Sequence, residues 1–128
     1  MSASYKPAGY TSVAPYLIVS SADDTIRFLA AVFDAKELRK FTDPAGRVVH
    51  AEVRLDDTVV MLAEGGGSFP AMPAHVHVYV SDVAAVYARA MAQGAISIQE
   101  PVKKDDEDKR GGIQDAGGTT WWLATRAG

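Results

Sequence analysis

Two histidine-containing pairs carry most of the chemistry that this sequence offers. His50 and Glu52 alternate along one apolar segment, and His75 and His77 alternate along another. Residues two apart on a β-strand point to the same face, so each pair is predicted to share a face. A histidine beside a carboxylate is a candidate general base with its orienting group. The interpretation that we favour for His50 and Glu52 is a structural hydrogen-bonded pair.

The four side chains would suit a metal ion if they converged. Three imidazoles and one carboxylate are ligands that Zn or Fe accepts. The catalytic candidates are therefore His50, Glu52 and His75, acting alone or with a metal. The competing interpretation is that these polar residues line a wet cavity or a dimer contact.

Aromatic side chains are predicted to line the same surface. By strand alternation Tyr16, Tyr79 and Trp122 face it, whereas Trp121 packs beneath a helix. An indole there would stack on a planar or hydrophobic ligand, or would fill the cavity. Phe69 is predicted to close over a ligand or to pack across a dimer. The predicted ligand-binding residues are Tyr16, His50, Glu52, Arg54, Met61, His75, His77, Tyr79 and Trp122.

The composition excludes several classes of protein. A chain of 128 residues fits one domain, 1–128. Its 13 Lys and Arg against 16 Asp and Glu give a net charge of −3, which argues against a nucleic-acid partner. The absence of cysteine excludes disulfides and thiolate metal sites. No apolar run reaches the roughly 18 residues that cross a membrane, and no signal peptide is recognised, so a cytoplasmic protein is expected.

The segments that position these residues form two similar halves. In the first half, strands are predicted at residues 13–19, 37–42, 48–55 and 58–63, with a helix at 22–33 capped by Ser21. In the second half, strands are predicted at 75–80, 96–99, 111–114 and 119–125, with a helix at 83–93. Residues 103–109 are predicted to be a charged, solvated loop.

The two halves are related as an internal repeat. Adding 61 moves Leu17 onto Val78 and Ser21 onto Asp82. The repeat predicts an α+β fold of two β-α-β-β-β modules, at about 13–63 and 74–126, joined by a linker at 64–73. The modules should form a curved antiparallel sheet around a cavity, within one chain or across a homodimer.

Several ordered motifs resemble the vicinal oxygen chelate superfamily, and most closely its PhnB-like branch. That superfamily includes glyoxalase I, bleomycin-resistance proteins and extradiol dioxygenases. The matching residues are Lys6-Pro7-Ala8-Gly9-Tyr10, Val13-Ala14-Pro15-Tyr16-Leu17-Ile18-Val19, Ile26-Arg27-Phe28, His50-Ala51-Glu52-Val53, His77-Val78-Tyr79-Val80-Ser81-Asp82-Val83, Lys109-Arg110-Gly111-Gly112-Ile113-Gln114 and the segment 115–125. The resemblance implies the glyoxalase-like fold and a small-molecule ligand.

The resemblance also implies four metal-binding positions on strands. They fall at Ala14, Met61, His75 and Trp122, of which His75 alone is a suitable ligand. The leading hypothesis is therefore a metal-independent protein that binds a small aromatic or hydrophobic molecule, with no cofactor. The alternatives are a Zn- or Fe-dependent lyase, isomerase or dioxygenase that uses His50, Glu52, His75 and His77, and a non-catalytic interaction domain whose cavity is filled. Whether a reaction is catalysed stays open.

Overall fold

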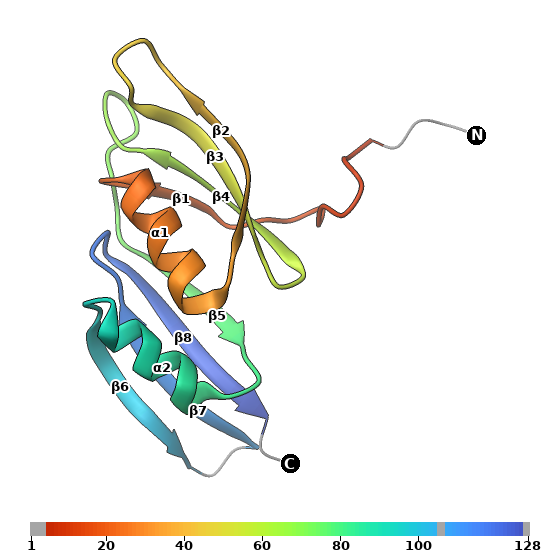
Figure 1. The fold of residues 1–128 in the computed structure, drawn as a ribbon, viewed down its shortest axis with the longest axis vertical. Helices are drawn as coiled ribbons and strands as arrows, with labels where there is room; N and C mark the ends of the chain where they lie inside the picture. The colour runs from red at the N-terminus through yellow and green to blue at the C-terminus, as the bar shows by residue number, and fades with distance from the viewer. Residues whose placement is uncertain (1–4, 105–106, 127–128) are drawn as a thin grey trace.

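The computed structural model describes residues 5–104 and 107–126. The chain forms, in order, β1 (Tyr16–Val19), α1 (Ala22–Phe33), β2 (Lys36–Thr42), β3 (Val48–Leu55), β4 (Thr58–Glu64), β5 (Ala74–Tyr79), α2 (Val83–Ala92), β6 (Ile96–Lys103), β7 (Asp108–Gln114) and β8 (Thr119–Arg126). This is the predicted β-α-β-β-β order, given twice (Figure 1).

Each module has its own four-stranded sheet. Sheet 1 has the order β1-β4-β3-β2 and sheet 2 the order β5-β8-β7-β6. Both sheets are mixed, because β1 runs parallel to β4 and β5 runs parallel to β8. The α+β fold is therefore confirmed, with mixed rather than wholly antiparallel sheets. The two sheets remain separate, since no strand of one pairs with a strand of the other among the described residues.

Both helices begin where the repeat predicts. The Ser21 side chain accepts a hydrogen bond from the Asp24 amide at 3.3 Å, and the Asp82 side chain accepts one from the Ala85 amide at 3.1 Å. Side-chain acceptors at this position satisfy free amides of the first helical turn. Neither helix in the part of the chain that the structure describes is long and apolar enough to cross a membrane.

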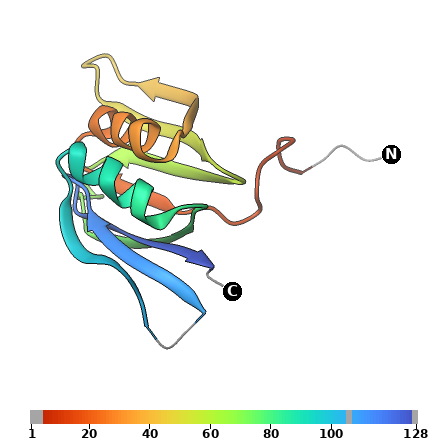
Figure 2. The same cartoon turned by 60° about the horizontal axis from the view of Figure 1, so that its bottom comes forward.

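One hydrophobic core joins the two modules. The helices lie side by side (Figures 1 and 2), and the Arg89 guanidinium of α2 donates to the Val32 carbonyl of α1 from two nitrogens, each at 3.1 Å. The Phe33 ring contacts the fully buried Trp121 ring, with centroids 5.4 Å apart. Trp121 thus packs under a helix, as predicted. The face of each sheet that carries no helix is called its open face below.

Three predicted boundaries are wrong by more than one residue. Residues 13–15 lie outside β1, and Val13 is 84% exposed. Strand β6 continues through Pro101, which is tolerated because β6 is an edge strand whose outer amides need no partner. The predicted solvated loop, of which residues 105–106 lie outside the described residues, ends earlier than predicted, because β7 begins at the buried Asp108.

Candidate functional site

A hollow of about 550 Å³ opens on sheet 1. Its walls come from the open face of the sheet and from the connector that follows β4. The lining residues are Tyr16, Ile18, Asp43, Arg47, Val49, Ala63, Glu64, Gly66 and Phe69. The term hollow refers to this set throughout.

Strand register places the apolar lining. In β1, Leu17 and Val19 are buried in the core, so alternation directs Tyr16 and Ile18 toward the open face. Ala63 of β4 is the register partner of Ile18 and lies beside it. These three positions follow from a regular strand pair.

Val49 reaches the hollow through a break in the alternation of β3. Strict alternation with Ala51 and Val53 would bury Val49, yet Val48 is 1% exposed and Val49 is 47% exposed. The pairing of β2 with β3 shifts register at this point, between Phe41 and Thr42. Such an irregularity redirects a side chain to the other face. Strand periodicity alone therefore missed this residue.

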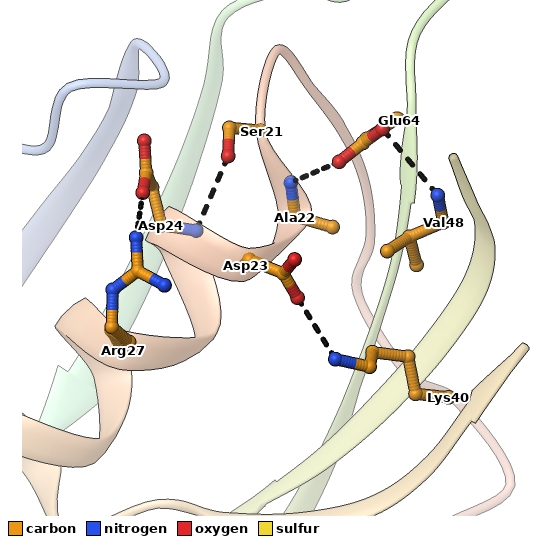
Figure 3. A network of polar contacts seen from close by, with 8 residues as sticks. All are labelled: Ser21, Ala22, Asp23, Asp24, Arg27, Lys40, Val48 and Glu64. Carbon is orange, nitrogen blue, oxygen red and sulfur yellow. Dashed lines mark hydrogen bonds and ion pairs between the residues drawn. The ribbon is translucent and has the colours of Figure 1, made fainter. Parts of the chain in front are cut away.

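Two carboxylates at one end of the hollow hold the backbone in place. Glu64 accepts hydrogen bonds from the Ala22 amide at 3.1 Å and from the Val48 amide at 3.4 Å, so it links the start of α1 to β3 (Figure 3). Asp43 accepts from the Ala45 and Arg47 amides at 3.0 and 2.9 Å. Their negative charges are thus partly offset by backbone N–H groups.

Arg47 supplies a positive charge at the same end. Its Nη2 donates to the Glu64 carbonyl at 3.1 Å. The guanidinium also lies against Gly66, where an added Cβ would sit 2.0 Å from Nη2. A side chain at position 66 would therefore displace the guanidinium from this place. Gly66 in turn pairs with Phe69, whose exposed ring forms the outer wall of the hollow.

A chain of hydrogen bonds starts at the Tyr16 side of the hollow. The Tyr16 hydroxyl lies 3.0 Å from His50 Nδ1, and His50 Nε2 lies 2.8 Å from Glu52 Oε2. The Tyr10 hydroxyl donates to Glu52 Oε1 at 2.5 Å, and Arg39 Nε lies 3.3 Å from the same oxygen. The Tyr16–His50–Glu52 chain thus joins β1 to β3 beside the hollow.

Glu52 is held in its ionised form. Burial alone would raise the pKa of its carboxyl. The hydrogen bonds from Tyr10 and His50, together with the Arg39 charge, outweigh burial, so the pKa of Glu52 lies below its usual value. A carboxylate can only accept hydrogen bonds, so His50 Nε2 carries a proton and donates to it. In the neutral imidazole, His50 Nδ1 then accepts the Tyr16 hydroxyl proton.

The open face of sheet 2 carries an aromatic platform. Trp122 Nε1 donates to His75 Nδ1 at 3.1 Å, and the two rings are nearly parallel with centroids 6.2 Å apart. The indole lies over Gly112, where an added Cβ would be 2.8 Å from ring atoms. Trp122 therefore lies on sheet 2 and is not among the residues that line the hollow on sheet 1.

A second polar cluster lies beside this platform. The Tyr79 hydroxyl donates to Asp108 at 2.8 Å, and Arg110 contacts both Asp108, at 3.0 Å, and His77 Nε2, at 3.3 Å. The hydrogen bond to the Asp108 carboxylate raises the pKa of Tyr79. An arginine can only donate, so His77 Nε2 acts as the acceptor.

The predicted site residues are divided between the two sheets. Tyr16 lines the hollow, and Met61 is its register partner in β4. His50 and Glu52 are in contact, as their spacing predicts. Arg54 donates to the Gly9 carbonyl at 2.6 Å instead of facing the hollow. The remaining residues, His75, His77, Tyr79 and Trp122, lie on sheet 2.

The residues present do not fit the metal that the resemblance implies. Within residues 5–104 and 107–126, no three His, Cys, Asp or Glu side chains are grouped so that they could hold a metal ion. The alternative cluster therefore does not form in one chain, because β3 and β5 belong to different sheets. At the superfamily positions, Ala14 and Trp122 have no side-chain atom that can bind a metal ion. His75 Nδ1 already accepts a hydrogen bond from Trp122 Nε1.

Comparison with known proteins identifies relatives of this chain. A sequence model of the Glyoxalase/Bleomycin resistance protein/Dioxygenase superfamily matches residues 9–123. The uncharacterized protein Mb0911c of Mycobacterium bovis is 31% identical over 123 residues, which span 88% of this chain and 81% of that protein.

Two solved structures share the fold. TioX from Micromonospora sp. ML1 matches with a TM-score of 0.77 and 22% identity over 91% of this chain and 98% of its own. The PhnB protein from Bacillus cereus matches with a TM-score of 0.69 and 19% identity over 90% of this chain and 99% of its own. The chain belongs to the Glyoxalase/Bleomycin resistance protein/Dioxygenase superfamily.

Proposed function

We propose that this superfamily member binds a small aromatic or hydrophobic molecule, without a metal ion, in the hollow on sheet 1. The observation that carries the proposal is the composition of that hollow. Ile18, Val49 and Ala63 supply apolar side chains, and the Tyr16 and Phe69 rings add flat apolar surface. Concave apolar sites with a few fixed polar groups are the usual form of small-molecule sites.

Exposed apolar surface provides the driving force for binding. Phe69 is 71% exposed and Tyr16 51% exposed, although both lie at the hollow. Covering apolar surface contributes about 25 cal/mol per Å², so a planar ligand that covers these rings would be stabilised by their burial. The Arg47 guanidinium, Asp43 and Glu64 would orient a polar end of the ligand.

Metal independence is supported by the chemistry of the side chains. Binding in the hollow uses stacking and apolar contact, which need no Lewis acid. His50 and Glu52, beside the hollow, are already engaged by Tyr16, Tyr10 and Arg39. The metal-dependent alternative has no comparable support, since its four residues are split between two sheets.

We further propose that the protein forms a homodimer. Large apolar side chains are exposed on both open faces, including Tyr16, Phe41, Val49, Tyr79 and Ile98. Exposed apolar patches of this kind mark association surfaces. A second copy seated over the open face of sheet 1 would enclose the hollow.

A substitution in the hollow tests the binding function. Val49→Lys places a charge among the apolar walls, while its partial exposure spares the core. A panel of planar aromatic compounds, measured by saturation-transfer NMR, should bind the wild-type protein at least about tenfold more tightly than this variant. The matched control is Ile96→Lys, an exposed apolar residue of β6 that lies outside the hollow. Equal binding by all three proteins, or by none, would contradict the proposal.

A further inference from the structure

We propose that the ligand of the hollow carries a weakly acidic hydroxyl group, phenolic or enolic, and that the Tyr16–His50–Glu52 chain takes up its proton. This inference rests on the proposed function, because it concerns the molecule bound in the hollow. It adds the chemical class of the ligand, and it gives His50 and Glu52, which do not line the hollow, a role in binding.

The direction of the hydrogen bonds supports proton uptake at His50. Glu52 fixes the proton on Nε2, so the lone pair of Nδ1 points to the Tyr16 hydroxyl. Tyr16 also lines the hollow and is half exposed, so a ligand hydroxyl can reach its oxygen. A buried carboxylate, an imidazole and an exposed hydroxyl in this order form the general arrangement by which proteins move a proton.

The proton transfer balances without a cofactor. The ligand O–H bond breaks and its proton forms a new O–H bond at Tyr16. The original Tyr16 proton passes to His50 Nδ1 and leaves Tyr16 neutral. The ligand is then an anion that accepts the Tyr16 O–H, and the new imidazolium donates to Tyr16 and to Glu52.

The groups that face His50 come from three strands. His50 faces Tyr16 from β1, the Phe41 ring from β2 and Glu52 on its own strand. Arg39 and Tyr10 reach the far oxygen of Glu52 rather than the imidazole.

The histidines of sheet 2 have the opposite setting. His77 faces the Arg110 guanidinium, and His75 Nδ1 is used as an acceptor by Trp122. Protonation would break either contact. His50 is therefore the histidine where a positive charge is compensated by a buried carboxylate.

The charges at the hollow are compatible with an anionic ligand. Both carboxylates there, Asp43 and Glu64, are bound to backbone amides. Arg47 presents its guanidinium from the same end. A phenolate or enolate oxygen near Tyr16 would thus lie in a site that holds fixed donors and one cation.

The test compares 4-nitrophenol with nitrobenzene, which lacks the hydroxyl. The 4-nitrophenolate anion has its own visible absorption band, so the ionisation of the bound probe is measured directly. At a pH one unit below the pKa of the free probe, where about a tenth of the free probe is ionised, the full-length protein should hold about half of the bound 4-nitrophenol as the anion. We expect about a tenfold preference for the anion over the neutral form. His50→Gln and Tyr16→Phe should abolish this preference, while nitrobenzene should bind His50→Gln, whose side chain does not line the hollow, as it binds the wild type.

The outcomes separate the two proposals. If neither probe binds saturably, the proposed function and this inference both fail. If nitrobenzene and 4-nitrophenol bind equally and no phenolate band appears, binding in the hollow stands and proton uptake is overturned. A phenolate band that persists in His50→Gln would also overturn it. The control variant is His77→Gln, on sheet 2, which should leave both probes unaffected.

Discussion

Glu52 is a buried carboxylate whose surroundings stabilise its charge, so folding stability should depend on its ionisation. Its pKa is lowered in the folded state, against a usual value of 4.5. The charged form therefore contributes stability that is fully present above that value and is lost as the pH falls through the lower folded pKa. Glu52→Gln should be less stable than the wild type at neutral pH and should show a shallower decline in acid. Urea unfolding at a series of pH values, from neutral into acid, measures how the free energy of unfolding of each protein depends on pH. Parallel curves for the wild type and Glu52→Gln would contradict the role assigned to Glu52.

Asp115 stabilises the turn between β7 and β8 and ties it to the buried Trp121. Its carboxylate accepts from the Gly117 and Thr119 amides, each at 3.0 Å, and from Trp121 Nε1 at 2.9 Å. Asp115→Ala would leave these donors without their acceptor in a buried region, so we expect a loss of about 2–4 kcal/mol in the free energy of unfolding.

Chemical denaturation followed by tryptophan fluorescence checks this value. Asp57→Ala is the control, since Asp57 is exposed and accepts a hydrogen bond from the adjacent Thr58 hydroxyl. Its effect should stay within about 0.5 kcal/mol. A loss at Asp115 no larger than this would show that the turn does not depend on the carboxylate.

The residue-scale contacts that sequence could predict are those within one strand. His50 and Glu52 contact each other because they are two apart on β3. The Tyr16 contact with His50 depends on β4 lying between β1 and β3, which local pattern does not specify. Arg47 and Glu64 were missed for the same reason, since their place at the hollow depends on the path of the connector.

At the scale of elements, Gly112 allows β7 and β8 to carry the aromatic platform. An alanine Cβ there would lie 2.8 Å from the Trp122 ring. Gly112→Ala should displace the indole, break its hydrogen bond to His75 and destabilise the fold by about 1–3 kcal/mol. If the clash is the cause, the same substitution should cost little in a Trp122→Leu background. This double-mutant cycle is measured by urea unfolding, and equal costs in both backgrounds would contradict the explanation.

Element boundaries were predictable where the signal is local. Helix α1 matches its prediction because Ser21 caps its start and Asp34, with a φ of 57°, ends it. Strand β6 was cut short at Pro101 because its position at the sheet edge is a property of the whole fold. The exposure of Val49 likewise depends on the pairing of β3 with β2.

At the scale of the whole molecule, the repeat accounts for two open faces of different character. Sheet 1 carries the hollow, whereas sheet 2 carries Trp122 stacked on His75. The repeated order of elements therefore does not make the two faces equivalent in chemistry. The superfamily hosts several activities, so function must be argued from the site itself.

Two copies should associate through these faces. Light scattering coupled to size exclusion should give twice the 13.6 kDa chain mass, because exposed apolar side chains on both open faces favour contact. Replacing Phe41, which is 51% exposed on the open side of β2 beside His50, with Lys should shift the protein toward monomer. A monomer at every concentration would contradict the proposed homodimer and leave the hollow as a site within one chain.

Chemical-shift mapping tests the central claim most directly. Uniformly ¹⁵N-labelled protein, purified without added metal and checked as metal-free by native mass spectrometry, is titrated with 4-nitrophenol. We expect saturable chemical-shift changes concentrated at the amides of Ile18, Val49 and Ala63, which line the hollow. Shifts centred on His75 and Trp122 instead, or binding that appears only after Zn or Fe is added, would contradict a metal-independent ligand site on sheet 1.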